Sequence, residues 1–82
     1  MEKQKRFTVT DLYLACYLQI NGILPELQSI NGRVIFTFPA TDELYKLVNA
    51  YNTGAAVSVL DYITALKNLR GQMHNVKAGV QQ

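Results

Sequence analysis

The sequence has 82 residues, of which 49% are apolar and 17% are charged, and its formal net charge is +2. This length supplies one hydrophobic core, and the composition is that of a globular rather than a disordered chain. The small net charge does not by itself indicate a nucleic-acid or membrane partner. The one cysteine cannot form a disulfide within the chain, so nothing points to secretion. We therefore expect a soluble cytoplasmic protein.

The N-terminal region contains a charged segment followed by a short alternating pattern. Residues 1–6 carry four charges and no core-forming side chain beyond the initiator methionine, so they are expected to be flexible. Phe7 and Val9 alternate with threonines, a pattern compatible with one short strand. Thr10, or the threonine two residues before it, is the expected N-cap of a helix that ends at Gly22.

This first helix is unusual because only Gln19 is plainly polar between Leu12 and Ile20. A helix that is apolar all round is buried or spans a membrane, and nine residues are too few to span one. Two arrangements remain open. Either the helix lies between the hairpin and the other helices, or one stripe of it faces a partner, most simply a second copy. The second arrangement predicts an interface at Tyr13, Leu14, Tyr17 and Leu18.

The segment "ILPELQSINGRVIFTF" carries the clearest structural signal. Its Asn-Gly pair, residues 31–32, is the preferred two-residue turn of a β-hairpin. The turn fixes the register, so Ile30 lies opposite Arg33 and Leu27 lies opposite Phe36. The apolar face of this hairpin is predicted to consist of Leu27, Val34, Phe36 and Phe38.

Two helices are predicted after the hairpin. Thr41 is a suitable N-cap for an amphipathic helix that ends near Gly54. Ser58 begins the next helix, which either closes just before Gly71 or continues to about Asn75. The apolar stripe of this last helix is predicted to comprise Val59, Tyr62, Ile63, Leu66, Leu69 and Met73.

The predicted elements define one small domain. Their order is helix, two-stranded antiparallel hairpin, helix and helix, with a short N-terminal strand as a further candidate element. A hairpin is marginally stable alone, so the helices must cover its apolar face. The sequence therefore predicts a single compact α+β domain over residues 7–75, with flexible tails at 1–6 and 76–82.

Three segments carry a resemblance to a known family. The sequences "TVTDLYLACYL", "NGRVIFTF" and "DELYKLVNAYNTG" resemble a small bacterial and phage family that is classified only as a domain of unknown function. The resemblance extends from Phe7 to about Met73. Its motifs are hydrophobic, so it supports the predicted order of elements and implies no activity and no catalytic or binding residue.

The residues that carry chemistry do not form a catalytic pattern. Cys16 and His74 are the only thiol and imidazole, and Cys16 lies mid-helix, where a packed thiol is the expected state. Two such ligands are too few for a structural zinc site. The glycines are isolated and do not form a phosphate-binding loop. We therefore predict that the protein is not an enzyme and needs neither a metal nor another cofactor.

Two functional hypotheses from different classes remain. The first is a protein-interaction module that forms a homodimer through the apolar helix surface. The second is an accessory protein that binds nucleic acid through a basic N-terminal tail and C-terminal helix. The second hypothesis assigns phosphate contacts to Lys3, Lys5, Arg6, Arg33, Lys67 and Arg70.

Overall fold

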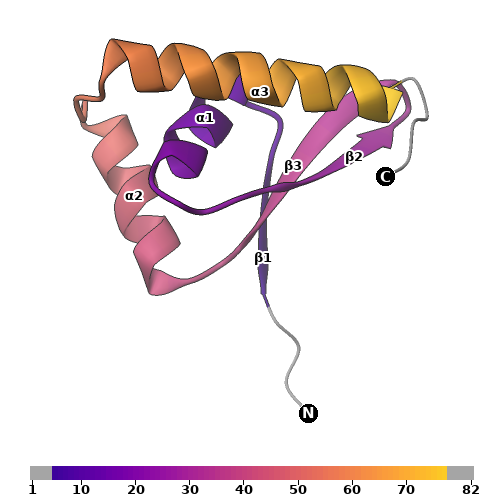
Figure 1. Ribbon diagram of the computed structural model, residues 1–82. Helices are drawn as coiled ribbons and strands as arrows, with labels where there is room; N and C mark the ends of the chain where they lie inside the picture. The colour runs from indigo at the N-terminus through magenta and orange to yellow at the C-terminus, as the bar shows by residue number, and fades with distance from the viewer. Residues whose placement is uncertain (1–4, 78–82) are drawn as a thin grey trace.

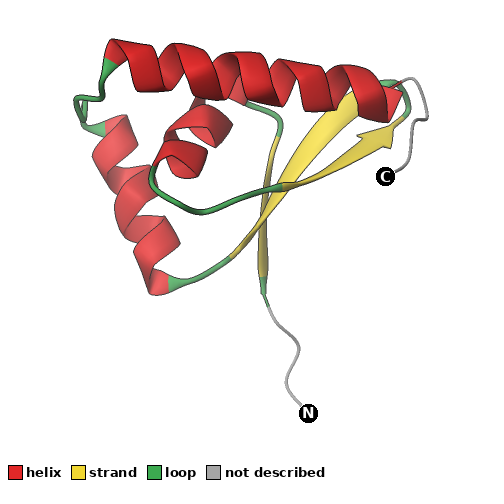
Figure 2. Cartoon of the chain, in the orientation of Figure 1, coloured by secondary structure: helices red, strands yellow, loops and turns green. Residues whose placement is uncertain are grey.

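The structure is a computed structural model, and it describes residues 5–77. Its elements are β1 (Arg6–Val9), α1 (Leu12–Ile20), β2 (Glu26–Ile30), β3 (Arg33–Pro39), α2 (Asp42–Asn52) and α3 (Val59–Lys77). The long helix α3 runs across the top of Figure 1, α2 lies at the left, and α1 lies between them and the strands. Figure 2 shows the helices and the sheet on separate sides, so the α+β prediction is confirmed.

The sheet has a topology that the sequence pattern did not reveal. Its strand order is β1-β3-β2, and β3 is antiparallel to both of its neighbours. The two outer strands are therefore parallel to each other, and α1 is the crossover that connects them. This arrangement is a split β-α-β unit, in which a later strand occupies the place between the first two.

The β2–β3 hairpin has the predicted register. Ile30 pairs with Arg33 and Leu27 pairs with Phe36. Asn31 and Gly32 have φ angles of 53° and 79°, as a type I′ turn requires at both central positions. Along β3 the side chains alternate between buried and partly exposed positions, so one face of the strand points into the core.

The short strand at Phe7 and Val9 is also present, and it pairs with Phe38 and Phe36 of β3. The strand begins at Arg6, however, which the sequence analysis placed in the flexible tail. The guanidinium of Arg6 forms an ion pair with Glu26 across the sheet at 3.2 Å. The predicted boundary was therefore one residue too late, because pairing with β3 extends to the end of that strand. The predicted tail residues 1–4 lie outside the described residues.

Helix α1 begins with a cap that differs from the prediction. The carboxylate of Asp11 accepts hydrogen bonds from the backbone N–H groups of Tyr13 at 2.9 Å and Leu14 at 3.3 Å. Asp11, and not Thr10, is thus the N-cap. A carboxylate satisfies two orphan amides and also interacts favourably with the positive end of the helix dipole. The helix ends at Ile20 with Asn21 as its C-cap, and Gly22 follows with a φ of +92°, the left-handed conformation expected of this glycine.

The core is centred on α1, which contributes five consecutive buried residues. They meet the buried side chains of β3, Leu44 of α2, and Ala65 and Leu69 of α3. The first of the two open arrangements, a central helix covered by the rest of the chain, is therefore correct. The buried apolar residues are Leu14, Ala15, Cys16, Tyr17, Leu18, Val34, Phe36, Phe38, Leu44, Ala65 and Leu69.

The two C-terminal helices begin at their predicted caps. The Oγ1 atom of Thr41 accepts the backbone N–H of Leu44 at 3.1 Å, and Oγ of Ser58 accepts that of Asp61 at 3.4 Å. Both helices therefore start with a side chain that satisfies one of their unpaired amides.

Helix α3 follows the second predicted alternative and ends two residues after Asn75. The helix continues through Gly71 to Lys77, so the predicted flexible tail began two residues too early. Partly buried Met73 and Val76 follow Gly71. Burial of these side chains offsets the roughly 1 kcal/mol that a mid-helix glycine costs. Residues 78–82 of the predicted tail lie outside the described residues.

Candidate interaction surfaces

The apolar stripe of α1 does not form a surface. Leu18 is 0% exposed, Leu14 is 8% exposed, and Tyr17 is also buried. The predicted interface is therefore wrong at these three residues, because α2, α3 and the sheet already cover them. Of the predicted set, only Tyr13 is exposed.

An exposed apolar surface lies instead at the start of α3. Val59 is 71% exposed and Leu60 is 76% exposed, and Ile63 is also exposed. A hollow of about 260 Å³ lies between four side chains of this region. We call the whole surface the apolar patch, and it consists of Val57, Val59, Leu60, Tyr62 and Ile63.

The apolar stripe predicted for α3 includes Val59 and Ile63, which are exposed. Their spacing is that of a buried stripe, but α3 buries Ala65 and Leu69 most completely. At 100° per residue, Ile63 lies about 120° around the helix from Leu69. The helix is thus rotated so that its first two turns present apolar side chains outward.

Tyrosine side chains connect the apolar patch to α1. The hydroxyl of Tyr62 donates a hydrogen bond to the backbone oxygen of Tyr13 at 3.2 Å. Burial, followed by weaker effects of Cys16 and Tyr51, raises the pKa of Tyr62 from 10.0 to about 12. Burial likewise raises the pKa of Tyr51. These hydroxyls are therefore neutral structural groups at ordinary pH.

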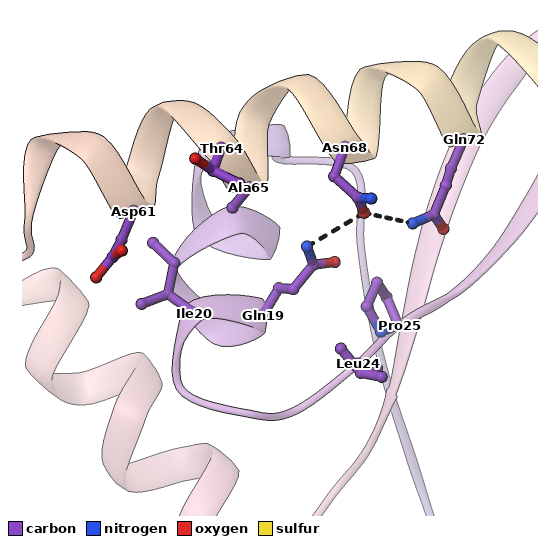
Figure 3. A pocket seen from close by; sticks show the side chains of 9 residues that line it. All are labelled: Gln19, Ile20, Leu24, Pro25, Asp61, Thr64, Ala65, Asn68 and Gln72. Carbon is purple, nitrogen blue, oxygen red and sulfur yellow. Dashed lines mark hydrogen bonds between the residues drawn. The ribbon is translucent and has the colours of Figure 1, made fainter.

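A groove separates the other flank of α3 from the end of α1 (Figure 3). It has a volume of about 580 Å³. The apolar part of its lining comes from both helices and from the segment that leads into β2: Ile20, Leu24, Pro25 and Ala65. The polar part consists of Gln19, Asp61, Thr64, Asn68 and Gln72.

Three side-chain amides meet in this groove. Oδ1 of Asn68 accepts a hydrogen bond from Nε2 of Gln19 at 3.3 Å and one from Nε2 of Gln72 at 2.6 Å. Figure 3 shows the amides side by side beneath α3. Among residues 5–77, no hydrogen bond satisfies Nδ2 of Asn68 or Oε1 of either glutamine. The Nδ2 group of Asn68 and Oε1 of both glutamines can therefore exchange water for a ligand.

The predicted nucleic-acid contacts do not form one surface. Lys67 and Arg70 are exposed on α3, and Arg33 lies at the hairpin tip, near the C-terminal end of that helix in Figure 1. Lys5 precedes β1 and Arg6 is its first residue. The start of β1 is remote from α3 in the same view, and Arg6 is paired with a carboxylate. The sixth residue of this set, Lys3, lies outside the described residues.

The residues considered for chemistry do not converge in the described part of the chain. Cys16 is 0% exposed, and burial raises the pKa of its thiol above the ordinary value of 9.0, so the reactive thiolate is disfavoured. His74 is exposed on α3. No group of three metal-ligating side chains occurs within residues 5–77. Within the same range, no helix has the length and hydropathy needed to cross a bilayer.

Comparison with known families gives one match. A family model described as a domain of unknown function, DUF5659, matches residues 4–75. The chain belongs to the DUF5659 family. The resemblance to an uncharacterised family is thus confirmed, while a bacterial or phage origin stays a prediction. Neither a curated protein nor a solved structure matches this DUF5659 domain.

Proposed function

We propose that this DUF5659 domain is a non-enzymatic protein-interaction module that forms a homodimer through the apolar patch. The observation that supports the proposal is the exposure of Val59, Leu60 and Ile63 side by side on α3. Large apolar side chains on a surface are ordinary when they are scattered, but a contiguous group marks an interaction site. Contact with a second copy would remove this group from water.

The distribution of charge along α3 favours a second copy in one orientation. The outward face of the helix is apolar from Val59 to Ile63, and from the middle of the helix onward it carries Lys67, Arg70, His74 and Lys77. A two-fold axis near Ile63 would bring the apolar halves together antiparallel and place the basic halves at opposite ends. A parallel arrangement would place like charges side by side, which is unfavourable.

The size of the patch sets the strength of this dimer. A stable interface buries about 800 Å² per partner, whereas the exposed side chains of the patch supply on the order of half that area. We therefore expect a weak dimer that forms as concentration rises, with a dissociation constant in the micromolar range.

Native mass spectrometry and sedimentation over a concentration series test the proposal. We expect a monomer–dimer equilibrium for the unmodified protein and a monomer for Leu60→Glu, with unchanged circular dichroism. Leu24→Glu is the matched control, because Leu24 is 69% exposed and lies outside the patch. Its dimer should persist. A monomer at several hundred micromolar, or equal dimerisation of the wild type and Leu60→Glu, would contradict the proposal.

Nucleic-acid binding is the second candidate, and the same basic half of α3 supports it. Four exposed groups, Lys67, Arg70, His74 and Lys77, lie along one side of the helix. Phosphate contacts by such a stripe would make binding strongly dependent on salt. Fluorescence anisotropy with mixed-sequence DNA and RNA tests this candidate. Binding that Lys67→Glu with Arg70→Glu abolishes would support it, and the absence of binding at 50 mM salt would exclude it.

A further inference from the structure

We propose that the groove between α1 and α3 receives an extended, basic polypeptide segment of a partner protein, which continues onto the outer edge of β2, where no strand of residues 5–77 pairs. This site is distinct from the apolar patch, because Ile63 and Asn68 lie about 140° apart around the axis of α3. The proposal therefore does not depend on self-association.

The dimensions of the groove fit an extended backbone. Its lining on α3 runs from Asp61 to Gln72, a distance of about 16 Å at 1.5 Å per residue. That length holds about five residues of extended chain. The polar lining recurs at nearly every turn, and Asn68 and Gln72 are one turn apart. This spacing of about 6 Å is close to the two-residue repeat of a strand, over which equivalent backbone groups recur.

The free amide groups match what such a backbone presents. Nδ2 of Asn68 can donate to a peptide carbonyl, and Oε1 of Gln19 and Oε1 of Gln72 can accept peptide N–H groups. The apolar part of the floor, including Ile20 and Leu24, can hold the side chains that alternate inward along the segment.

The neighbouring strand supplies a second, independent feature. β2 is an outer strand of the sheet, and Ile30 and Arg33 form the hydrogen-bonded pair that flanks the two-residue turn. Pairs alternate along an antiparallel ladder, so Leu27 and Ser29 direct their backbone N–H and C=O groups away from β3. Pro25, at the end of the groove, leads into this edge. A segment leaving the groove can therefore add to β2 as a further strand.

Charge specifies the kind of segment. The groove lining contains the carboxylate of Asp61 and no cationic side chain. Asp61 forms no ion pair with another residue of the described range. A lysine or arginine on the bound segment would pair with this exposed carboxylate, whereas an acidic segment would be repelled.

The test uses a blocked six-residue peptide of alternating lysine and valine, with its glutamate–valine counterpart as the matched probe. Both are titrated into ¹⁵N-labelled Leu60→Ser protein, so that self-association is weakened and no carboxylate is added beside Asp61. In ¹H–¹⁵N NMR spectra we expect chemical-shift changes at the side-chain amides of Asn68 and Gln72 and at the backbone amides of Leu27 and Ser29. At low salt, the lysine peptide should bind several-fold more tightly than the glutamate peptide.

Three variants separate the parts of the site. Asp61→Asn should remove the preference for lysine, and Gln72→Ala should weaken binding several-fold. Ser29→Pro should suppress the shifts along β2, because it removes an outward N–H without breaking the ladder to β3. Asn75→Ala, an exposed amide on α3 outside the groove lining, is the control and should bind normally.

Several outcomes would overturn the proposal. One is the absence of shift changes at millimolar peptide. A second is equal affinity for the two peptides, and a third is a set of shifts centred on the apolar patch. None of these outcomes affects the dimer measured with the unmodified protein, so failure of this inference and failure of self-association can be told apart.

Discussion

Helices α1 and α3 differ in composition and in burial, and the helix that is richer in apolar residues exposes fewer of them. α1 is almost entirely apolar, and five of its nine residues are buried. α3 has polar residues throughout its 19 residues, and only Ala65 and Leu69 are buried. Yet the exposed apolar patch belongs to α3. The surroundings of a helix, and not its composition, therefore decide which apolar side chains remain in water.

The difference has a topological cause. α1 connects the two outer strands of the sheet and is covered by both other helices, so most of its surface meets a neighbour. α3 packs along α1 and the sheet with one side only, and its first turns lie away from the strands (Figure 1). Residues such as Val59 and Leu60 consequently lack a partner within the described chain.

The largest expected effect comes from truncating one leucine in each helix. Leu18→Ala should lower the free energy of unfolding by about 3 kcal/mol, because it leaves a cavity in a closed core. Leu60→Ala should change it by less than about 0.5 kcal/mol, because the side chain is already in water. Urea denaturation of both variants measures this difference. Similar losses in the two variants would show that the assigned burial of these helices is wrong.

The helix caps give a smaller and sharper comparison. Asp11→Ala should cost about 1 kcal/mol, because its carboxylate satisfies two amides at the start of α1. Ser58→Ala should cost about 0.5 kcal/mol, because its 3.4 Å bond is long. Thr10→Ala is the control and should be nearly neutral. Equilibrium unfolding of the three variants tests this order, which a larger loss at Thr10 would contradict.

Burial of Tyr62 gives an effect that appears only at alkaline pH. The pKa of Tyr62 rises from 10.0 to about 12 on folding, so the folded state favours the neutral hydroxyl. The neutral Tyr62 hydroxyl contributes fully to the free energy of unfolding below pH 10. This contribution decreases as the pH rises toward 12. Tyr62→Phe should make the unfolding free energy less dependent on pH in this range. An unchanged pH profile would refute the assignment of this group.

Local patterns were sufficient to predict the hairpin and most of the helix limits. The Asn-Gly pair indicated a two-residue type I′ turn, and the length of that turn fixed the pairing of Leu27 with Phe36. Thr41 and Ser58 marked the starts of α2 and α3 for the same kind of reason, since a cap acts on the next few residues. The cap of α1 was assigned wrongly because Thr10 and Asp11 are both suitable and adjacent.

The candidate sites depend on contacts between distant segments, which such patterns do not contain. Gln19 and Asn68 are 49 residues apart, and no periodicity indicates that their amides meet. The rotation of α3 that exposes Ile63 follows from its packing on α1. The interface assigned to Leu14 and Leu18 failed for the same reason, because the sequence left open which elements cover that helix.

The order of the strands also constrains how the chain can fold. β1 is made first, yet within residues 5–77 it pairs only with β3, whose last residue, Pro39, follows some 30 residues later. The β2–β3 hairpin closes a two-residue turn and can form without the rest of the sheet, whereas docking of β1 requires closure of a long loop that includes α1. During synthesis, Phe7 and Val9 therefore cannot pair with β3 until the hairpin has emerged from the ribosome.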